Sequence, residues 1–312
     1  MMQRPGERSE PTRGIEWPTL ALAAMIYGGW ISLTLFHAYV PLWLLVPLGA
    51  WLVCWHSSLQ HEVLHGHPTR IRWLNDALAF PPLALWLPYA RYRASHLQHH
   101  DNTRLTDPLD DPESRYLTPE DWARTSPLTK LALRVQATLA GRLLIGPFWS
   151  IGTFLAGEAR MLLAGNRTLL ATWAAHLLAA GLVCLWLVAV CDMSLWLYVV
   201  AFALPGTSLM LIRSFCEHRA DADVDRRTAI VEGRGPLSLL FLNNNLHAAH
   251  HECPGLAWYA LPRYWRENSV RLLDANGGLH YRGYGDVFAR FLLRPHDEVA
   301  HPLGRAPRPS AE

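Results

Sequence analysis

Two stretches of 45 residues in this chain are almost free of charged side chains, and this feature limits the possible folds most. Trp17 to His61 contains no Asp, Glu, Lys or Arg, and Thr168 to Ile212 contains only Asp192. A helix needs about 20 apolar residues to cross the hydrocarbon core of a bilayer. Each stretch therefore predicts a hairpin of two membrane helices. The four expected spans cover residues 18–37, 41–60, 169–190 and 195–213.

The positions of the basic residues orient these spans. All 28 Lys and Arg residues lie in residues 1–16, in residues 62–167 or from residue 213 onward. An excess of Lys and Arg marks the cytoplasmic side of a membrane protein. We expect an integral protein of a bacterial inner membrane, with both termini and the active site in the cytoplasm. The net charge of +2 is too small to suggest a nucleic-acid partner.

The rest of the chain predicts three regions. We expect a disordered cytoplasmic tail at residues 1–16, a membrane domain at residues 17–294 and a loose tail at residues 295–312. We expect His296 and His301, in the last of these, to be solvated. Two further apolar runs, Leu74–Ala90 and Leu143–Gly157, are too short or too interrupted by proline and glycine to span, which favours interfacial or re-entrant segments. The predicted fold is all-α, with a helical cytoplasmic cap on four membrane helices.

The histidine residues give the main indication of the chemistry that this chain can perform. Three clusters stand out: His61-Glu-Val-Leu-His65, His96-Leu-Gln-His-His100 and His247-Ala-Ala-His-His251. Residues i, i+3 and i+4 share one face of a helix, so each cluster can direct imidazoles at one point. With 16 His in 312 residues, the pattern HxxHH should occur by chance roughly 0.04 times, yet it occurs twice. We interpret the clusters as metal sites.

All three clusters fall on the predicted cytoplasmic side, where they can meet. His218 follows the fourth span on the same side and is a further candidate. The candidate ligands are His61, His65, His96, His99, His100, His218, His247, His250 and His251. Nine imidazoles are too many for one tetrahedral zinc and suit two metals. Glu62, Glu217 and Asn244 lie close to these ligands in the sequence and are candidates to orient them.

The three clusters resemble the HxxxH, HxxHH and HxxHH boxes of membrane fatty acid desaturases and hydroxylases, in order and in placement. The resemblance covers residues 17–265 and includes the Trp258-Tyr-Ala-Leu-Pro262 ending after the third box. It implies two irons bound by the box histidines, with O₂ as co-substrate. In acyl-CoA desaturases of this superfamily an extra His after the fourth span also binds iron, and His218 matches its place. The companion Asn one turn earlier is Ser214 here.

The resemblance implies an O₂-dependent di-iron oxidoreductase that introduces a double bond into a fatty acyl chain, either lipid-linked or a thioester. Breaking an unactivated C–H bond needs an oxidant made on a redox metal, which zinc cannot provide. The same boxes serve hydroxylases and ketolases of lipids, carotenoids and other alkyl substrates, so this alternative stays open. The sequence holds no His-Pro-Gly-Gly segment of a cytochrome b5 domain. We therefore expect a separate electron donor of ferredoxin, rubredoxin or cytochrome b5 type, with its reductase.

Two hypotheses from other classes compete with this interpretation. His61-Glu62-Val-Leu-His65 is also the HExxH pattern of zinc proteases, with Glu62 as general base. That reading leaves both HxxHH clusters without a role. A non-enzymatic metal or haem carrier would favour histidines buried inside the spans, whereas these clusters sit at the membrane face.

Overall fold

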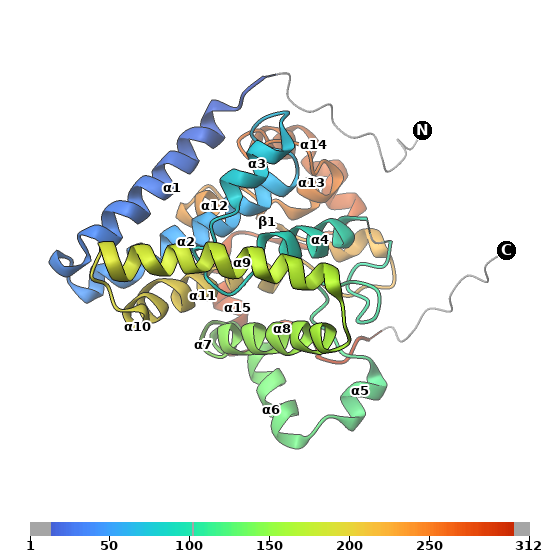
Figure 1. The fold of residues 1–312 in the computed structure, drawn as a ribbon. Coiled ribbons are helices and arrows are strands. Elements are labelled where there is room, and N and C mark those ends of the chain that lie inside the picture. Colours follow the sequence, from blue (N-terminus) through green and yellow to red (C-terminus); the bar gives the residue numbers. More distant parts are fainter. Residues whose placement is uncertain (1–13, 102, 303–312) are drawn as a thin grey trace.

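Four helices of the computed structural model, which describes residues 14–101 and 103–302, are long and apolar enough to cross a membrane. They are α1 (Trp17–Leu35), α2 (Leu42–Leu64), α9 (Arg167–Leu185) with its continuation η2 (Trp186–Val190), and the continuous run of α10 (Leu195–Tyr198), η3 (Val199–Ala203) and α11 (Leu204–Cys216). The predicted count of spans and the all-α membrane fold are confirmed (Figure 1). Both α2 and α11 continue beyond the predicted span ends at residues 60 and 213.

The helix α2 lies at the centre and packs closely against the span formed by η3 and α11. Glycine allows this approach. A Cβ atom on Gly49 would lie 2.7 Å from the ring of Phe202, and a Cβ atom on Gly206 would lie 2.6 Å from the side chain of Val53. Small residues at such contacts let membrane helices pack backbone to backbone. These contacts hold the ends of α2 and α11, from which several of the histidines project, at a defined separation.

A proline-rich segment enters the space among the spans between α3 (Arg72–Ala79) and α4 (Tyr89–His100). The last carbonyl groups of α3 and those of the irregular backbone after it lack helical partners, and in a bilayer such groups are costly unless protein satisfies them. Side chains of the spans do so. The pairs are Tyr27 with the carbonyl of Leu78 (2.5 Å), Gln60 with Ala79 (2.9 Å), Tyr198 with Leu83 (2.7 Å) and His176 with Leu85 (2.9 Å). The interfacial or re-entrant interpretation of this segment stays a prediction. The contacts orient α4, which carries the second histidine cluster.

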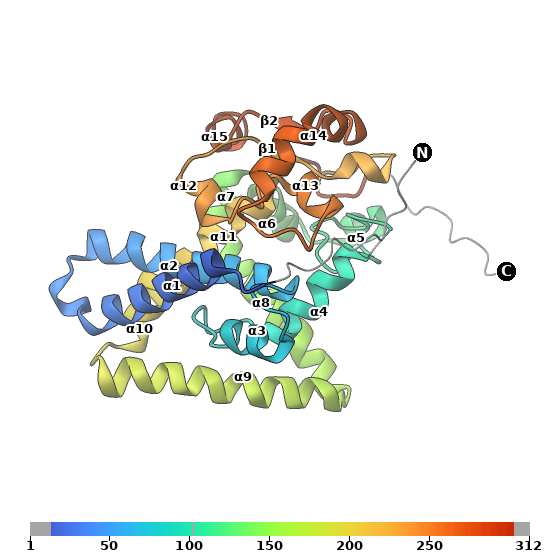
Figure 2. The same ribbon diagram turned by 90° about the horizontal axis from the view of Figure 1, so that it is seen from above.

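The remaining elements gather mainly at one end of the spans. Figure 2 shows the turn after α1 and the turn before α10 at one end of the molecule, and α4, α13 and α14 at the other. The helices not yet named are η1 (His37–Tyr39), α5 (Pro119–Arg124), α6 (Pro127–Gln136), α7 (Leu139–Leu144), α8 (Gly146–Leu163), η4 (Val224–Arg227), α12 (Pro236–Leu240), α13 (His247–Glu252), α14 (Leu261–Ala275) and α15 (Tyr284–Phe291). Two short strands, β1 (Ile230–Val231) and β2 (His280–Tyr281), pair in parallel. We call α4, α5, α13 and α14, with the loops at residues 103–118 and 253–260, the cap.

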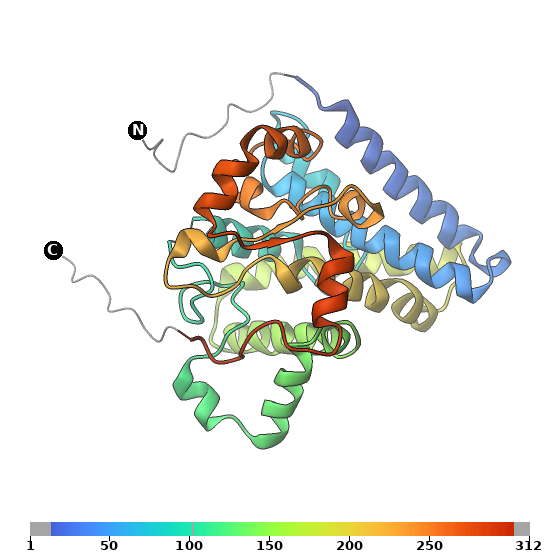
Figure 3. The ribbon, with the colours of Figure 1, turned by 180° about the vertical axis from the view of Figure 1, so that it is seen from behind.

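The two predicted tails differ from the expectation where the structure describes them. Residues 1–13 and 303–312 lie outside the described residues, but Glu16 is buried, with 3% of its surface exposed. Residues 295–302 run from α15 back along α7 and α8 (Figure 3), and His296 donates its backbone N–H to the carbonyl of Ala137 (2.8 Å). His301 is 4% exposed rather than solvated. These contacts join residues far apart in the chain, which composition alone does not reveal.

Candidate metal centre

The nine histidines singled out in the sequence come together in the cap-side half of the molecule and form two groups. The first group contains His61, His65, His96, His100 and His250, and the second contains His99, His218, His247 and His251. Within each group, one ring nitrogen from each residue lies within 4.8 Å of all the others. The two HxxHH clusters divide between the groups according to their spacing: residues i and i+4 face one group, and residue i+3 faces the other. In α4, for example, His96 and His100 face one group and His99 faces the other.

The distances between ring nitrogens match the spacing of ligands around a metal. Four Nε2–Nε2 pairs lie close together: His99–His218 (3.0 Å), His247–His218 (3.0 Å), His96–His100 (3.0 Å) and His250–His100 (3.1 Å). Imidazole nitrogen binds a divalent metal at roughly 2.0–2.1 Å, so two ligands at right angles lie about 3.0 Å apart. The groups are therefore already spaced to hold metals.

Hydrogen bonds made by the outer ring nitrogens, the Nδ1 atoms, determine whether the inner ring nitrogens, the Nε2 atoms that face one another, carry a proton. The Nδ1 atom of His99 lies 2.9 Å from a carboxylate oxygen of Asp111, and that of His247 lies 3.1 Å from the amide oxygen of Asn244. The Nδ1 atom of His218 faces the carbonyl of Arg227 at 3.3 Å. Each of these three Nδ1 atoms must donate, so in the neutral imidazole, the form that binds a metal, each Nε2 carries a lone pair. Lone pairs 3.0 Å apart repel unless a cation lies between them, and the donor set of this group therefore fits a metal.

The first group has the same character. His96 donates Nδ1–H to Glu113 (3.0 Å), which leaves its Nε2 as an acceptor. The Nε2 atom of His65 is buried with no hydrogen-bond partner among the described residues, as is that of His251 in the second group. Orphaned buried nitrogens of this kind are costly in a protein unless a ligand satisfies them.

Burial keeps most of these rings neutral, which is the form that binds a metal. It lowers the pKa of His65, His250 and His251 well below the ordinary value, and the neighbouring imidazoles lower it further. Burial and the charges of His96 and His99 lower the pKa of His100 to about 2. His99 is different: burial lowers its pKa, but the hydrogen bond to Asp111 and the surrounding carboxylates outweigh burial and raise it.

Two of the three candidate orienting residues lie at these groups. Glu217 accepts a hydrogen bond from Asn244 (3.2 Å), pairs with Arg213 (3.0 Å) and lies 3.4 Å from Nδ1 of His247. The side-chain amide of Asn244 also lies 3.4 Å from Nε2 of His61. Asn244 therefore contacts one histidine of each group.

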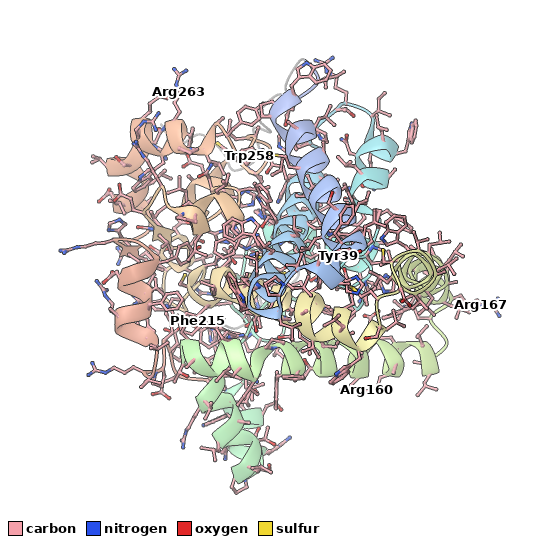
Figure 4. All side chains as sticks on the ribbon, turned by 90° about the vertical axis from the view of Figure 1, so that its left-hand side faces the viewer. Tyr39, Arg160, Arg167, Phe215, Trp258 and Arg263 are labelled. Atoms are coloured by element: carbon pink, nitrogen blue, oxygen red, sulfur yellow. The ribbon has the colours of Figure 1, made fainter. Side chains whose placement is uncertain are left out.

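The third candidate, Glu62, faces elsewhere. Its carboxylate accepts the backbone N–H of Trp258 (2.8 Å) and lies 3.8 Å from Nε2 of His67. His67 in turn is bonded to Glu16 (2.7 Å). Figure 4 shows Trp258 beside α1, where its indole N–H donates to Thr19 (3.2 Å). This buried set joins the start of α1 to the end of α2.

Asp111 and Glu113 were not among the candidate orienting residues chosen from the sequence. Asp111 is almost fully buried, whereas Glu113 is partly exposed. The only signal for them was the run of acidic residues after the second cluster, in which nothing distinguishes these two from the others. Ser214, which stands in place of the expected asparagine, is exposed on α11.

Comparison with known proteins gives one match. A family model with the description "Fatty acid desaturase" matches residues 35–285, a range that includes all nine histidines and reaches from the end of α1 into α15. No curated protein matches the chain.

Proposed function

Because the chain belongs to the fatty acid desaturase family, and so is a membrane oxidoreductase of the desaturase and hydroxylase type, we propose that it introduces a double bond into a fatty acyl chain with two iron ions and O₂. The observation that carries the proposal is the convergence of nine imidazoles, in which Nε2 of His218 lies 3.0 Å from Nε2 of both His99 and His247. The acyl chain is lipid-linked or a thioester.

The two histidine groups would hold one iron each. Bound iron would supply, from O₂, the oxidising power that an unactivated C–H bond requires. The protein's own part is to hold and shield the site. Asp111, Glu113 and Asn244 fix the orientation of their histidines, and such partners typically tune metal affinity by about 10- to 100-fold. Five of the nine ligand histidines are buried and the other four are partly buried, which limits the access of water to the reacting centre.

We infer the orientation of the protein in the membrane and its electron donor from the sequence. The excess of Lys and Arg on the cap side supports a cytoplasmic position for the cap and both termini, and we propose that the membrane is a bacterial inner membrane. Reducing equivalents come from a separate ferredoxin, rubredoxin or cytochrome b5 type donor with its reductase. The reaction partitions between a double bond and an alcohol according to where the substrate carbon sits, because small displacements change the outcome of a positioned reaction.

Lipid analysis tests the reaction. We expect that expression in a host that supplies O₂ and a donor system will yield acyl chains lighter by two hydrogen atoms. Mass spectrometry of the extracted lipids checks this, with a His99→Ala variant as the matched control. A product heavier by one oxygen atom would instead assign hydroxylation, and unchanged lipids with an iron-loaded protein would remove acyl chains as the substrate.

Glu62 separates this proposal from the zinc-protease hypothesis. We expect Glu62→Gln to keep more than about a tenth of the wild-type activity, because a glutamine oxygen can still accept the N–H of Trp258 and loses mainly one charge-assisted hydrogen bond. A general base contributes roughly 10²–10⁴-fold, so the protease hypothesis predicts near-complete loss. Turnover and metal analysis measure the difference: two irons per chain agree with our proposal, and one zinc contradicts it.

A further inference from the structure

A segment beyond the family match lies against the metal centre. Residues 294–301, which we call the strap, follow α15, whereas the match ends at residue 285. All of the strap except Arg294 was expected to belong to the loose tail at residues 295–312.

The strap pairs with the loop that orients two of the ligands. Leu117 donates its N–H to the carbonyl of Val299 (2.9 Å), and His301 donates its N–H to the carbonyl of Leu117 (2.8 Å). The ring of His301 packs edge-on against Tyr116, with centroids 5.3 Å apart. Leu117 ends the loop of residues 103–117, which carries Asp111. The strap therefore closes the loop from which a buried carboxylate reaches His99.

Asp297 is the centre of the strap's contacts. Its carboxylate accepts from the hydroxyl of Tyr116 (2.9 Å) and from Nδ1–H of His296 (2.6 Å), and it forms an ion pair with Arg115. Nε2 of His296 is held by the hydroxyl of Tyr281 at 2.7 Å. The side chain of Asp297 is 14% exposed and that of Arg115 is 20% exposed.

Arg115 links Asp297 to the backbone beside the metal centre. It donates to the carbonyl of Phe215 and, over 3.1 Å, to the carbonyl of His218. His218 follows the end of α11 and has its Nε2 within 3.0 Å of two ligand candidates of the second group. An unbroken series of polar contacts thus leads from Asp297 through Arg115 to the backbone of His218.

The carboxyl group of Asp297 is ionised at neutral pH. Burial alone would raise its pKa, but the hydrogen bond from His296 and the positive charge of Arg115 lower it to about 2. Removing one partner of a largely buried pair leaves the other charge poorly compensated, which is more damaging than loss of a surface pair. Loss of the Asp297 charge should therefore displace Arg115 from the carbonyl of His218.

We propose that Asp297 and Arg115 are positioning residues for the second metal group, so that the strap is a working part of the site. The inference rests on the proposed function, because it takes His99, His218, His247 and His251 as ligands of one iron. It goes beyond that function by assigning a role to a segment outside the family match.

The test compares neighbouring substitutions in the full chain. Asp297→Asn keeps the shape of the side chain and removes its charge, Asp297→Glu keeps the charge, and Glu298→Gln changes an exposed neighbour. We expect two irons per chain in the wild type and in Glu298→Gln. Asp297→Asn should fall to about one, since loss of such supporting contacts costs about 10- to 100-fold in metal affinity. Asp297→Glu should recover most of the lost iron.

Two readouts separate positioning from general stability. One of two components should disappear from the Mössbauer spectrum of Asp297→Asn, while its helical circular dichroism stays at the wild-type level. A second variant with a stop codon after Arg294 should show the same loss of iron, whereas a stop codon after Pro302 should not. Two irons and an unchanged spectrum in Asp297→Asn would overturn the inference alone. A wild-type protein without iron would overturn the proposed function and, with it, the inference.

Discussion

Replacing His99 or His250 by alanine should abolish turnover, with a loss of roughly a thousandfold or more, equivalent to at least about 4 kcal/mol. The two residues come from different clusters and belong to different metal groups. Nε2 of His99 lies 3.0 Å from that of His218, and Nε2 of His250 lies 3.1 Å from that of His100. Each substitution removes one imidazole from its group and leaves the remaining nitrogens facing one another without their full metal environment. Turnover measures the loss of activity, iron content measures the loss of metal, and extraction of the membranes shows whether the variant is still inserted.

Histidines outside the groups provide the controls. His37 lies in the turn η1, at the end of the spans opposite the cap, and His280 lies on β2 with Glu232 as its partner (3.2 Å). His37→Ala and His280→Ala should keep two irons and near wild-type activity. All four variants should insert into the membrane, since none of these side chains contributes to the apolar surface of a span. Undiminished turnover in His99→Ala or His250→Ala would remove the histidine groups from the mechanism.

The spans and the histidine clusters were predictable because both depend on local patterns. An uncharged stretch of sufficient length makes a membrane helix in almost any context. The HxxHH spacing places its histidines on one face of a helix, whatever the position of that helix in the fold. Even His218 could be placed on the same side as the three clusters, because it closely follows the fourth apolar stretch, and the helix α11 ends just before it.

The orienting residues could not be predicted so well, since their role depends on direction and on contacts distant in sequence. Glu62 adjoins His61, but neighbours on an α-helix point about 100° apart, and its carboxylate reaches Trp258 and His67 instead. Glu217 follows the regular part of α11 and lies close to His247. The strap shows the same limit: its partner Arg115 lies about 180 residues earlier in the chain, and composition favoured a loose tail.

Asp111 and Asp110 show how this limit can be tested, because they are adjacent and chemically identical. Oδ1 of Asp111 accepts from His99 (2.9 Å) and from the backbone N–H of Glu113 (2.9 Å), and Oδ2 accepts from the backbone N–H of Thr106 (2.8 Å). Asp110 instead forms a half-exposed pair with Arg104 (3.0 Å). Of these two neighbours, Asp111 contacts a candidate metal ligand and Asp110 does not.

Asp111→Asn should lower iron affinity and activity by about 10- to 100-fold. An asparagine has one oxygen, so in either orientation its NH₂ group faces an N–H donor that the aspartate satisfied, and a buried unsatisfied donor costs about 1–3 kcal/mol. Asp110→Asn should change activity by no more than about threefold, since an exposed ion pair contributes about 0–1 kcal/mol. Iron titration of the metal-free proteins and turnover at saturating donor compare the two variants directly. Equal effects at both positions would mean that Asp111 does not orient His99, and that this ligand finds its direction from the fold of α4 alone.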